Sequence, residues 1–169
     1  MLTIHRPLAD DSVSVVTEGG RIAALGPYAG LYAAHGDRAR VREWAGTLTA
    51  GRYEPDAVRL LETFYWPDPR EADELGTEPL PAGSAPMTDA RWGGSARRGL
   101  QRMLGRGVTA VAGPFTRPPV RTAVQRSGVL VGPGAPALAP GARADFTVLA
   151  GDGSCVVTVV GGRLVYRSA

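Results

Sequence analysis

The fold is decided by two neighbouring stretches near the end of the chain, Pro140-Gly-Ala-Arg-Ala-Asp-Phe-Thr-Val-Leu-Ala150 and Val156-Val-Thr-Val-Val-Gly-Gly-Arg-Leu-Val165. Residues 146–150 follow a Pro-Gly turn and are rich in residues that favour strands. The β-branched run 156–160 leads through Gly161-Gly162 into residues 163–166, which is the pattern of a β-hairpin. The sequence therefore predicts two consecutive strands and a returning third.

A second hairpin is predicted at the other end of the chain, where residues 12–16 and 21–25 flank a Glu-Gly-Gly turn. A two-stranded hairpin is at best marginally stable alone in water. The two hairpins are therefore expected to combine in one sheet or sandwich, and the residues between them form an insert.

The chain resembles the amidohydrolase superfamily in three places. These are the terminal pattern from Leu138 to Val165, the segment Gly20-Arg-Ile-Ala-Ala-Leu-Gly26 and the segment Gly46-Thr-Leu-Thr-Ala-Gly51. The most similar branches are imidazolonepropionase and the aminodeoxyfutalosine deaminase of menaquinone biosynthesis. In this family both chain ends build a small β domain, called the composite domain, beside a metal-binding (β/α) barrel.

The resemblance implies an α+β fold with a β-sandwich-like composite domain from residues 1–46 and 138–169. Residues 47–137 would form an inserted remnant of a (β/α) barrel with about two βα units, because a complete barrel needs about 250 residues and the chain has 169. The expected elements of the insert are a strand at 46–53, helices at 95–105 and 118–126, and short strands at 107–112 and 129–131. We expect one compact unit.

The family's metal site is not retained in this pattern. Its first barrel strand runs into Pro-Gly-x-x-(Asn or Asp)-x-His-x-His, and its two histidine positions fall on Asp56 and Val58. The two histidines present, His5 and His35, precede this strand and are interpreted as surface or capping residues. Asp56 is interpreted as the start of a helix. We therefore expect no catalytic residue, no metal and no cofactor.

The segment Phe64-Tyr-Trp-Pro-Asp-Pro-Arg-Glu71 is the least ordinary of the chain. One interpretation is a proline-stiffened loop whose aromatic side chains fill the core. The other is a binding or interface surface, because aromatic and arginine side chains are common interface anchors. The candidate residues are Tyr65, Trp66, Asp68, Arg70 and Glu71. An open sheet edge beside this segment favours a homodimer or larger oligomer.

The amino-acid composition argues against some classes of binding partner and some kinds of catalytic chemistry. The 19 basic residues, all arginine, nearly balance 16 acidic ones, and no nucleic-acid motif accompanies them, so we expect no nucleic-acid partner. The absence of lysine excludes a lysine carbamate or Schiff base and is typical of a bacterium with a GC-rich genome. The single cysteine, Cys155, is expected to be buried. No leader or membrane-spanning run is visible, which favours a cytoplasmic protein.

Three functions remain open at this stage. The first is a non-catalytic, amidohydrolase-related protein (a pseudoenzyme) that binds a small molecule or a partner enzyme. The second is a hydrolase or deaminase acting on C–N bonds other than peptide bonds, with a site that is unrecognised or completed by another subunit. The third is a structural accessory to an enzyme of the menaquinone (futalosine) pathway or of histidine degradation.

Overall fold

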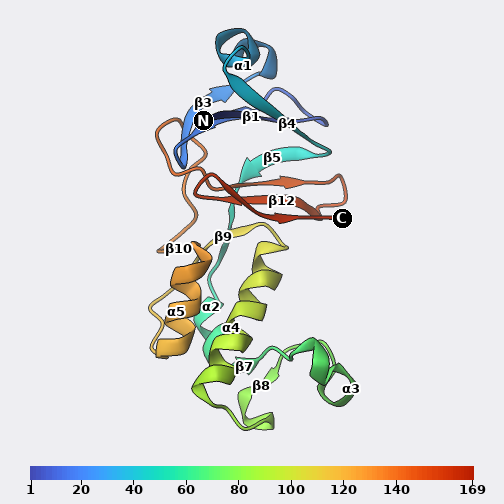
Figure 1. Ribbon diagram of the computed structural model, residues 1–169, viewed down its shortest axis with the longest axis vertical. Coiled ribbons are helices and arrows are strands. Elements are labelled where there is room, and N and C mark those ends of the chain that lie inside the picture. The colour runs from blue at the N-terminus through green and yellow to red at the C-terminus, as the bar shows by residue number, and fades with distance from the viewer.

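A computed structural model describes all residues, 1–169, and shows an elongated α+β molecule (Figure 1). Both termini lie in a β-rich half, and the helices α4 and α5 fill the other half. The α+β class expected from the sequence is therefore confirmed. No helix of the structure has the length and apolar character needed to cross a membrane.

The N-terminal sheet has the strand order β3-β2-β1-β4. The predicted hairpin is present as β2 and β3, which pair antiparallel, and β1 pairs parallel with β4. Helix α1 makes the crossover that a parallel pair requires. The bounds are β1 Leu2–Pro7, β2 Ser14–Glu18, β3 Arg21–Gly26, α1 Tyr28–His35 and β4 Ala39–Trp44.

The C-terminal sheet is antiparallel throughout, with the order β13-β12-β11-β5. Its last three strands are the ones predicted from the terminal stretch, with Gly161 and Gly162 at the hairpin turn at φ +56° and +76°. Cys155 at the start of β12 is buried, as expected. The bounds are β5 Thr47–Ala50, β11 Phe146–Leu149, β12 Cys155–Val160 and β13 Arg163–Arg167.

The two hairpins lie in different sheets that share one hydrophobic core. The core residues are Val15, Ile22, Trp44, Leu48, Ala144, Phe146, Val148, Val157 and Val159. The two Gly-Gly turns also touch, since a Cβ on Gly162 would lie 2.9 Å from the Cα of Gly20. Only glycine permits this approach of two backbones, and it joins the two ends of the chain.

The interpretation of His5 as a surface residue is wrong. His5 is only 2% exposed in the core between the sheets, where its ring stacks on Trp44 and meets the edge of Phe146. Trp44 Nε1–H donates to His5 Nδ1 over 3.3 Å, and His5 Nε2 lies 3.3 Å from the Thr17 hydroxyl. Its position on a buried strand between aromatic rings, which single-sequence reading does not reveal, explains the error. His35 is half-buried at the end of α1.

The middle of the chain forms a parallel sheet, in the order β10-β9-β6, packed with helices. The expected alternation of strands and helices is present. One core joins the sheet to α2, α4 and α5 and includes Leu61, Leu100, Val111 and Val124. The bounds are β6 Arg52–Glu54, α2 Ala57–Glu62, α4 Asp89–Leu104, β9 Val108–Val111, α5 Pro118–Ser127 and β10 Leu130–Val131.

The strand predicted at 46–53 is in fact two strands. The chain leaves the C-terminal sheet after β5 and enters the parallel sheet as β6, with Gly51 between them. A Cβ on Gly51 would lie 1.9 Å from Thr109 Oγ1, so only glycine allows the chain to pass β9 here. One continuous run of strand-forming residues thus serves two sheets.

Helix α4 begins at Asp89, six residues before the predicted start at Ser95. Thr88 is the N-cap, and its hydroxyl accepts a hydrogen bond from Arg91 N–H at 3.2 Å. The pair Gly93-Gly94 lies inside the helix. Ser95, predicted as the cap, is buried, and its hydroxyl accepts from Trp66 N–H and donates to the Phe64 carbonyl.

The segment before α4 contains short elements where we expected irregular loops. Strands β7 and β8 pair antiparallel, and two 3₁₀ turns and a one-turn helix surround them. Their bounds are β7 Phe64–Tyr65, η1 Pro69–Glu71, α3 Ala72–Leu75, β8 Leu80–Pro81 and η2 Ala82–Ser84. This arrangement holds the unusual aromatic segment against the N-terminal half of α4.

Candidate functional site

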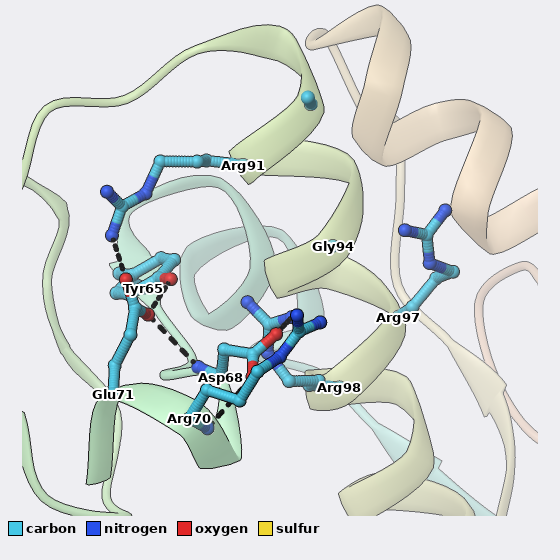
Figure 2. A pocket seen from close by; sticks show the side chains of 9 residues that line it. Tyr65, Asp68, Arg70, Glu71, Arg91, Gly94, Arg97 and Arg98 are labelled. Atoms are coloured by element: carbon cyan, nitrogen blue, oxygen red, sulfur yellow. Dashed lines mark hydrogen bonds and ion pairs between the residues drawn. The ribbon is translucent and has the colours of Figure 1, made fainter. Parts of the chain in front are cut away.

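A polar pocket of about 450 Å³ lies between η1 and the N-terminal half of α4 (Figure 2). Four arginines and two acidic residues line it, and only two of its lining residues are hydrophobic. The lining residues are Tyr65, Asp68, Arg70, Glu71, Ala90, Arg91, Gly94, Arg97 and Arg98. We call this site the arginine pocket.

Local hydrogen bonds fix the conformation of η1, which forms one wall of the arginine pocket. Asp68 caps the turn, because its carboxylate accepts from Arg70 N–H at 2.9 Å, and Glu71 accepts in return from Asp68 N–H at 3.2 Å. This reciprocal pair is a capping box. Pro69 occupies the first position of the turn, where its fixed φ suits the geometry. Both carboxylates are thereby held at the pocket wall.

Glu71 is engaged by two further groups, as Figure 2 shows. The Tyr65 hydroxyl donates a short hydrogen bond to Glu71 Oε2, and Arg91 Nη2 donates to Glu71 Oε1 over 2.9 Å. The Arg91 guanidinium also lies 4.7 Å from the centre of the Tyr65 ring, in a cation–π contact. The Tyr65 hydrogen bond, the Asp68 N–H and the Arg91 charge together lower the pKa of Glu71, so this carboxylate is charged at neutral pH.

Asp68 pairs with two further arginines of the pocket, Arg70 and Arg98. Arg70 Nε lies 3.2 Å from Asp68 Oδ1, and Arg98 Nη1 lies 3.7 Å from Asp68 Oδ2. The Arg70 N–H, followed by the Arg70 and Arg98 charges, lowers the pKa of Asp68. Arg98 is also anchored by its Nε–H, which donates to the Trp66 carbonyl at 2.8 Å. The two carboxylates therefore hold arginine side chains in place.

Arg97 and Gly94 complete the pocket on the α4 side. Arg97 is exposed and makes no hydrogen bond or ion pair with the chain. A Cβ on Gly94 would lie 3.2 Å from Arg98 Nη1 and 3.8 Å from Arg97 Nη2. Two guanidinium groups thus approach one point beside Gly94.

The structure brings together four of the five residues proposed from the sequence, namely Tyr65, Asp68, Arg70 and Glu71. Trp66 does not line the arginine pocket. It is 8% exposed, its indole N–H donates to the Leu60 carbonyl, and Gly99 leaves room for its ring. Within the single chain Trp66 is therefore buried between α2 and α4.

Sequence reasoning missed the α4 half of the pocket. Arg91, Gly94 and Arg98 are spaced by three and four residues, which places them on one face of a helix. This signal was readable, but starting the helix at Ser95 excluded two of the three residues. Arg97 and Arg98 were seen only as residues outside the apolar face.

The residues present do not fit a catalytic metal of the kind that the family resemblance implies. Such a zinc needs three protein ligands, usually histidine or carboxylate. Asp56 is the N-cap of α2 and pairs with Arg59 at 3.4 Å, and Val58 packs on the helical core. His5 and His35 lie in the other half of the molecule, and nowhere do three His, Cys, Asp or Glu residues cluster with metal-binding geometry.

No family model matches the sequence. No curated protein matches it either. Among solved structures, the chain is similar to A. niger ochratoxinase at 17% identity and a TM-score of 0.49, covering 77% of this chain and 30% of that one. It is also similar to an adenosine deaminase from Xanthomonas campestris with bound zinc, at 15% identity and a TM-score of 0.46, over 76% of this chain and 31% of that one.

A third solved structure, guanine deaminase from Bradyrhizobium japonicum, is 17% identical with a TM-score of 0.41, over 77% of this chain and 33% of that one. The chain thus spans about a third of the length of the structures it matches. At TM-scores below 0.5 these likenesses do not establish a shared fold.

Proposed function

We propose that this protein is an amidohydrolase-related binding protein that recognises a small anionic ligand in the arginine pocket. The observation that carries the proposal is the charge of that pocket. Its four guanidinium groups face only two carboxylates. Arg70, Arg91 and Arg98 pair with these carboxylates, which also accept from backbone N–H groups and from the Tyr65 hydroxyl, and Arg97 has no partner. A surplus of positive charge in a concave, mostly polar site favours an anion.

The proposed relation to the amidohydrolases rests on the terminal sequence patterns. We propose residues 1–46 and 138–169 as the composite part and residues 47–137 as the inserted βα part. The core shared by the two four-stranded sheets and the parallel order β10-β9-β6 support this division. In this proposal the protein binds and does not catalyse, which the side chains at Asp56 and Val58 support.

The proposal is tested by titrating the purified protein with a panel of anions while its thermal unfolding and its NMR spectrum are recorded. We expect at least one anion to raise Tm and to shift the amide signals of η1 and of the first two turns of α4. The variant Arg98→Gln should lose both effects, whereas Arg121→Gln, an exposed arginine of α5 outside the pocket, should retain them. An absence of any anion response in these residues would refute the proposal.

The alternative hydrolase or deaminase function is decided by metal analysis. Zinc or iron bound at one equivalent per chain, and retained after dialysis against a chelator, would favour an enzyme whose ligands include residues of another subunit. The same preparation should then release ammonia from an amino-substituted heterocycle. Under the binding proposal, neither metal retention nor ammonia release is expected.

A further inference from the structure

Two guanidinium groups of the arginine pocket converge beside Gly94. A Cβ at this position would lie within 4 Å of nitrogens from both Arg97 and Arg98. Any compact anion placed above Gly94 would therefore contact two guanidinium groups at once. Gly94 itself is buried beneath the Arg98 guanidinium. An anion at this point would therefore rest on the guanidinium groups on the pocket side and not on the helix backbone.

The donors around this point are not consumed within the chain. Arg97 makes no hydrogen bond to the chain, and Arg70 uses only its Nε–H, toward Asp68. Arg98 uses its Nε–H and Nη1, which leaves Nη2 unpaired. A guanidinium carries five N–H donors in a planar fork that matches oxyanion geometry. Several charge-assisted hydrogen bonds are therefore available to one oxyanion.

The Glu71 side of the pocket has a different role. Tyr65, Arg91 and the backbone of Asp68 satisfy the Glu71 carboxylate, and Arg91 covers the Tyr65 ring. These contacts fix η1 against α4. On the other side of the pocket, Asp68 pairs with Arg70 of η1 and with Arg98 of α4. The free positive charge is thus concentrated toward Gly94, away from Glu71.

We propose, on the basis of the function proposed above, that the arginine pocket binds the dianionic phosphate group of a small polar phosphate monoester above Gly94, between Arg97 and Arg98. The surplus of two positive charges among the lining residues matches a dianion and exceeds what one carboxylate would balance. The volume of about 450 Å³ leaves room beside the phosphate, and the scarcity of apolar lining residues suits a polar body such as a polyol.

The first arm of the test compares anions by isothermal titration calorimetry. Glycerol phosphate, inorganic phosphate and sulfate should bind, and acetate and nitrate should bind at least about tenfold more weakly, since one or more charge-assisted hydrogen bonds are lost. Between pH 7.5 and pH 5.5 the affinity for glycerol phosphate should fall about fourfold, because the second pKa of a phosphate monoester is near 6. The affinity for sulfate, which stays doubly charged, should not fall in this way.

The second arm uses variants that fold. Gly94→Ala places a methyl group 3.2 Å from Arg98 Nη1, so the Arg98 guanidinium must shift from its position beside the anion. Alanine also has a higher helix propensity than glycine by about 1 kcal/mol, and the thermal unfolding of the variant is recorded to show that it folds. Arg97→Gln removes a side chain that has no partner in the chain. Each should weaken phosphate binding about tenfold or more, and Arg121→Gln should leave it unchanged.

The outcomes separate this inference from the proposed function. If dianions are preferred and Gly94→Ala and Arg97→Gln both weaken them, the inference holds. If anions bind in the pocket but monoanions bind equally well, or neither variant has an effect, the inference is wrong while the proposed function stands. If no anion perturbs the residues of η1 or α4, both are refuted.

Discussion

The buried histidine predicts a loss of stability in mild acid. Trp44 Nε1 is only a donor, so His5 Nδ1 must be the acceptor and His5 Nε2 carries the proton that faces the Thr17 hydroxyl. Adding a second proton would place two N–H donors against each other inside the core. Burial, followed by the charge of Arg42, lowers the pKa of His5 from 6.5 to about 4.

The sign and size of the effect follow from this pKa. His5 stays neutral in the folded protein, whereas the unfolded chain takes up a proton below pH 6.5. The folded state is therefore destabilised as the pH falls from 6.5 toward 4, with a total of roughly 3 kcal/mol. Between pH 7.5 and pH 5 the expected loss in the free energy of unfolding is about 2 kcal/mol.

The assay is urea denaturation at several pH values between 5 and 7.5, for the unmodified protein and for His5→Gln and His35→Gln. In His5→Gln the free energy of unfolding should no longer fall between pH 7.5 and pH 5, whatever the stability of this variant at pH 7.5. In His35→Gln the fall should remain. Carboxyl groups with a shifted pKa, such as Asp68 and Asp145, whose ordinary pKa is 3.8, contribute equally to the pH dependence of all three proteins. Subtracting the free energy of unfolding of a variant from that of the unmodified protein therefore removes their contribution. An unchanged slope in His5→Gln would refute the reasoning.

Three further predictions concern the sheets. Gly162→Ala should destabilise the protein by about 1–3 kcal/mol in urea denaturation, because φ is +76° and Gly20 Cα would lie 2.9 Å from the new Cβ; Gly151→Ala, with open space around it, should change little. Removal of residues 156–169 deletes β12 and β13, so circular dichroism of the truncated protein should show no cooperative melting; an unchanged melting curve would contradict a core shared by both chain ends. Light scattering at micromolar concentration should show a homodimer or larger oligomer, since β6 and β10 are open edges of the parallel sheet; a monomer would reject this.

One argument for oligomerisation does not survive the structure. One interpretation of the aromatic segment from the sequence was an interface surface anchored by its aromatic side chains. Tyr65 and Trp66 are instead 2% and 8% exposed within a single chain, beneath α4 and its arginines. The open edges of the parallel sheet remain the only basis for the dimer prediction.

The hairpins were predictable because their determinants are local. A β-branched run, a Gly-Gly turn and a returning run specify pairing without reference to any distant residue. The same holds for α5, whose predicted span differs from the observed Pro118–Ser127 by a single residue. Two of the errors elsewhere involve glycines. The predicted strand 46–53 runs through Gly51, where the chain changes sheets beside Thr109, and the predicted helix 95–105 begins after Gly94, which lies inside α4 beside two guanidinium groups.

Half of the candidate site could be predicted for a similar reason. The η1 wall is one contiguous segment with unusual composition, so it is visible in the sequence. The α4 wall begins 20 residues after Glu71, and the shared helix face of Arg91, Gly94 and Arg98 does not by itself connect them to η1. Only the structure shows that Asp68 and Glu71 accept both from local groups of the η1 segment and from arginines of α4.

The balance of donors and acceptors supports the proposed anion site. Arg70, Arg91 and Arg98 pair with the two carboxylates, and such surface ion pairs are worth little to stability. Because backbone N–H groups and the Tyr65 hydroxyl take part of the carboxylate acceptor capacity, these arginines retain N–H donors, and Arg97 has no partner in the chain. Pre-positioned donors bind an anion with less loss of side-chain freedom than flexible ones. The chain thus places surplus positive charge beside Gly94, which is the physical basis for the proposed dianion site.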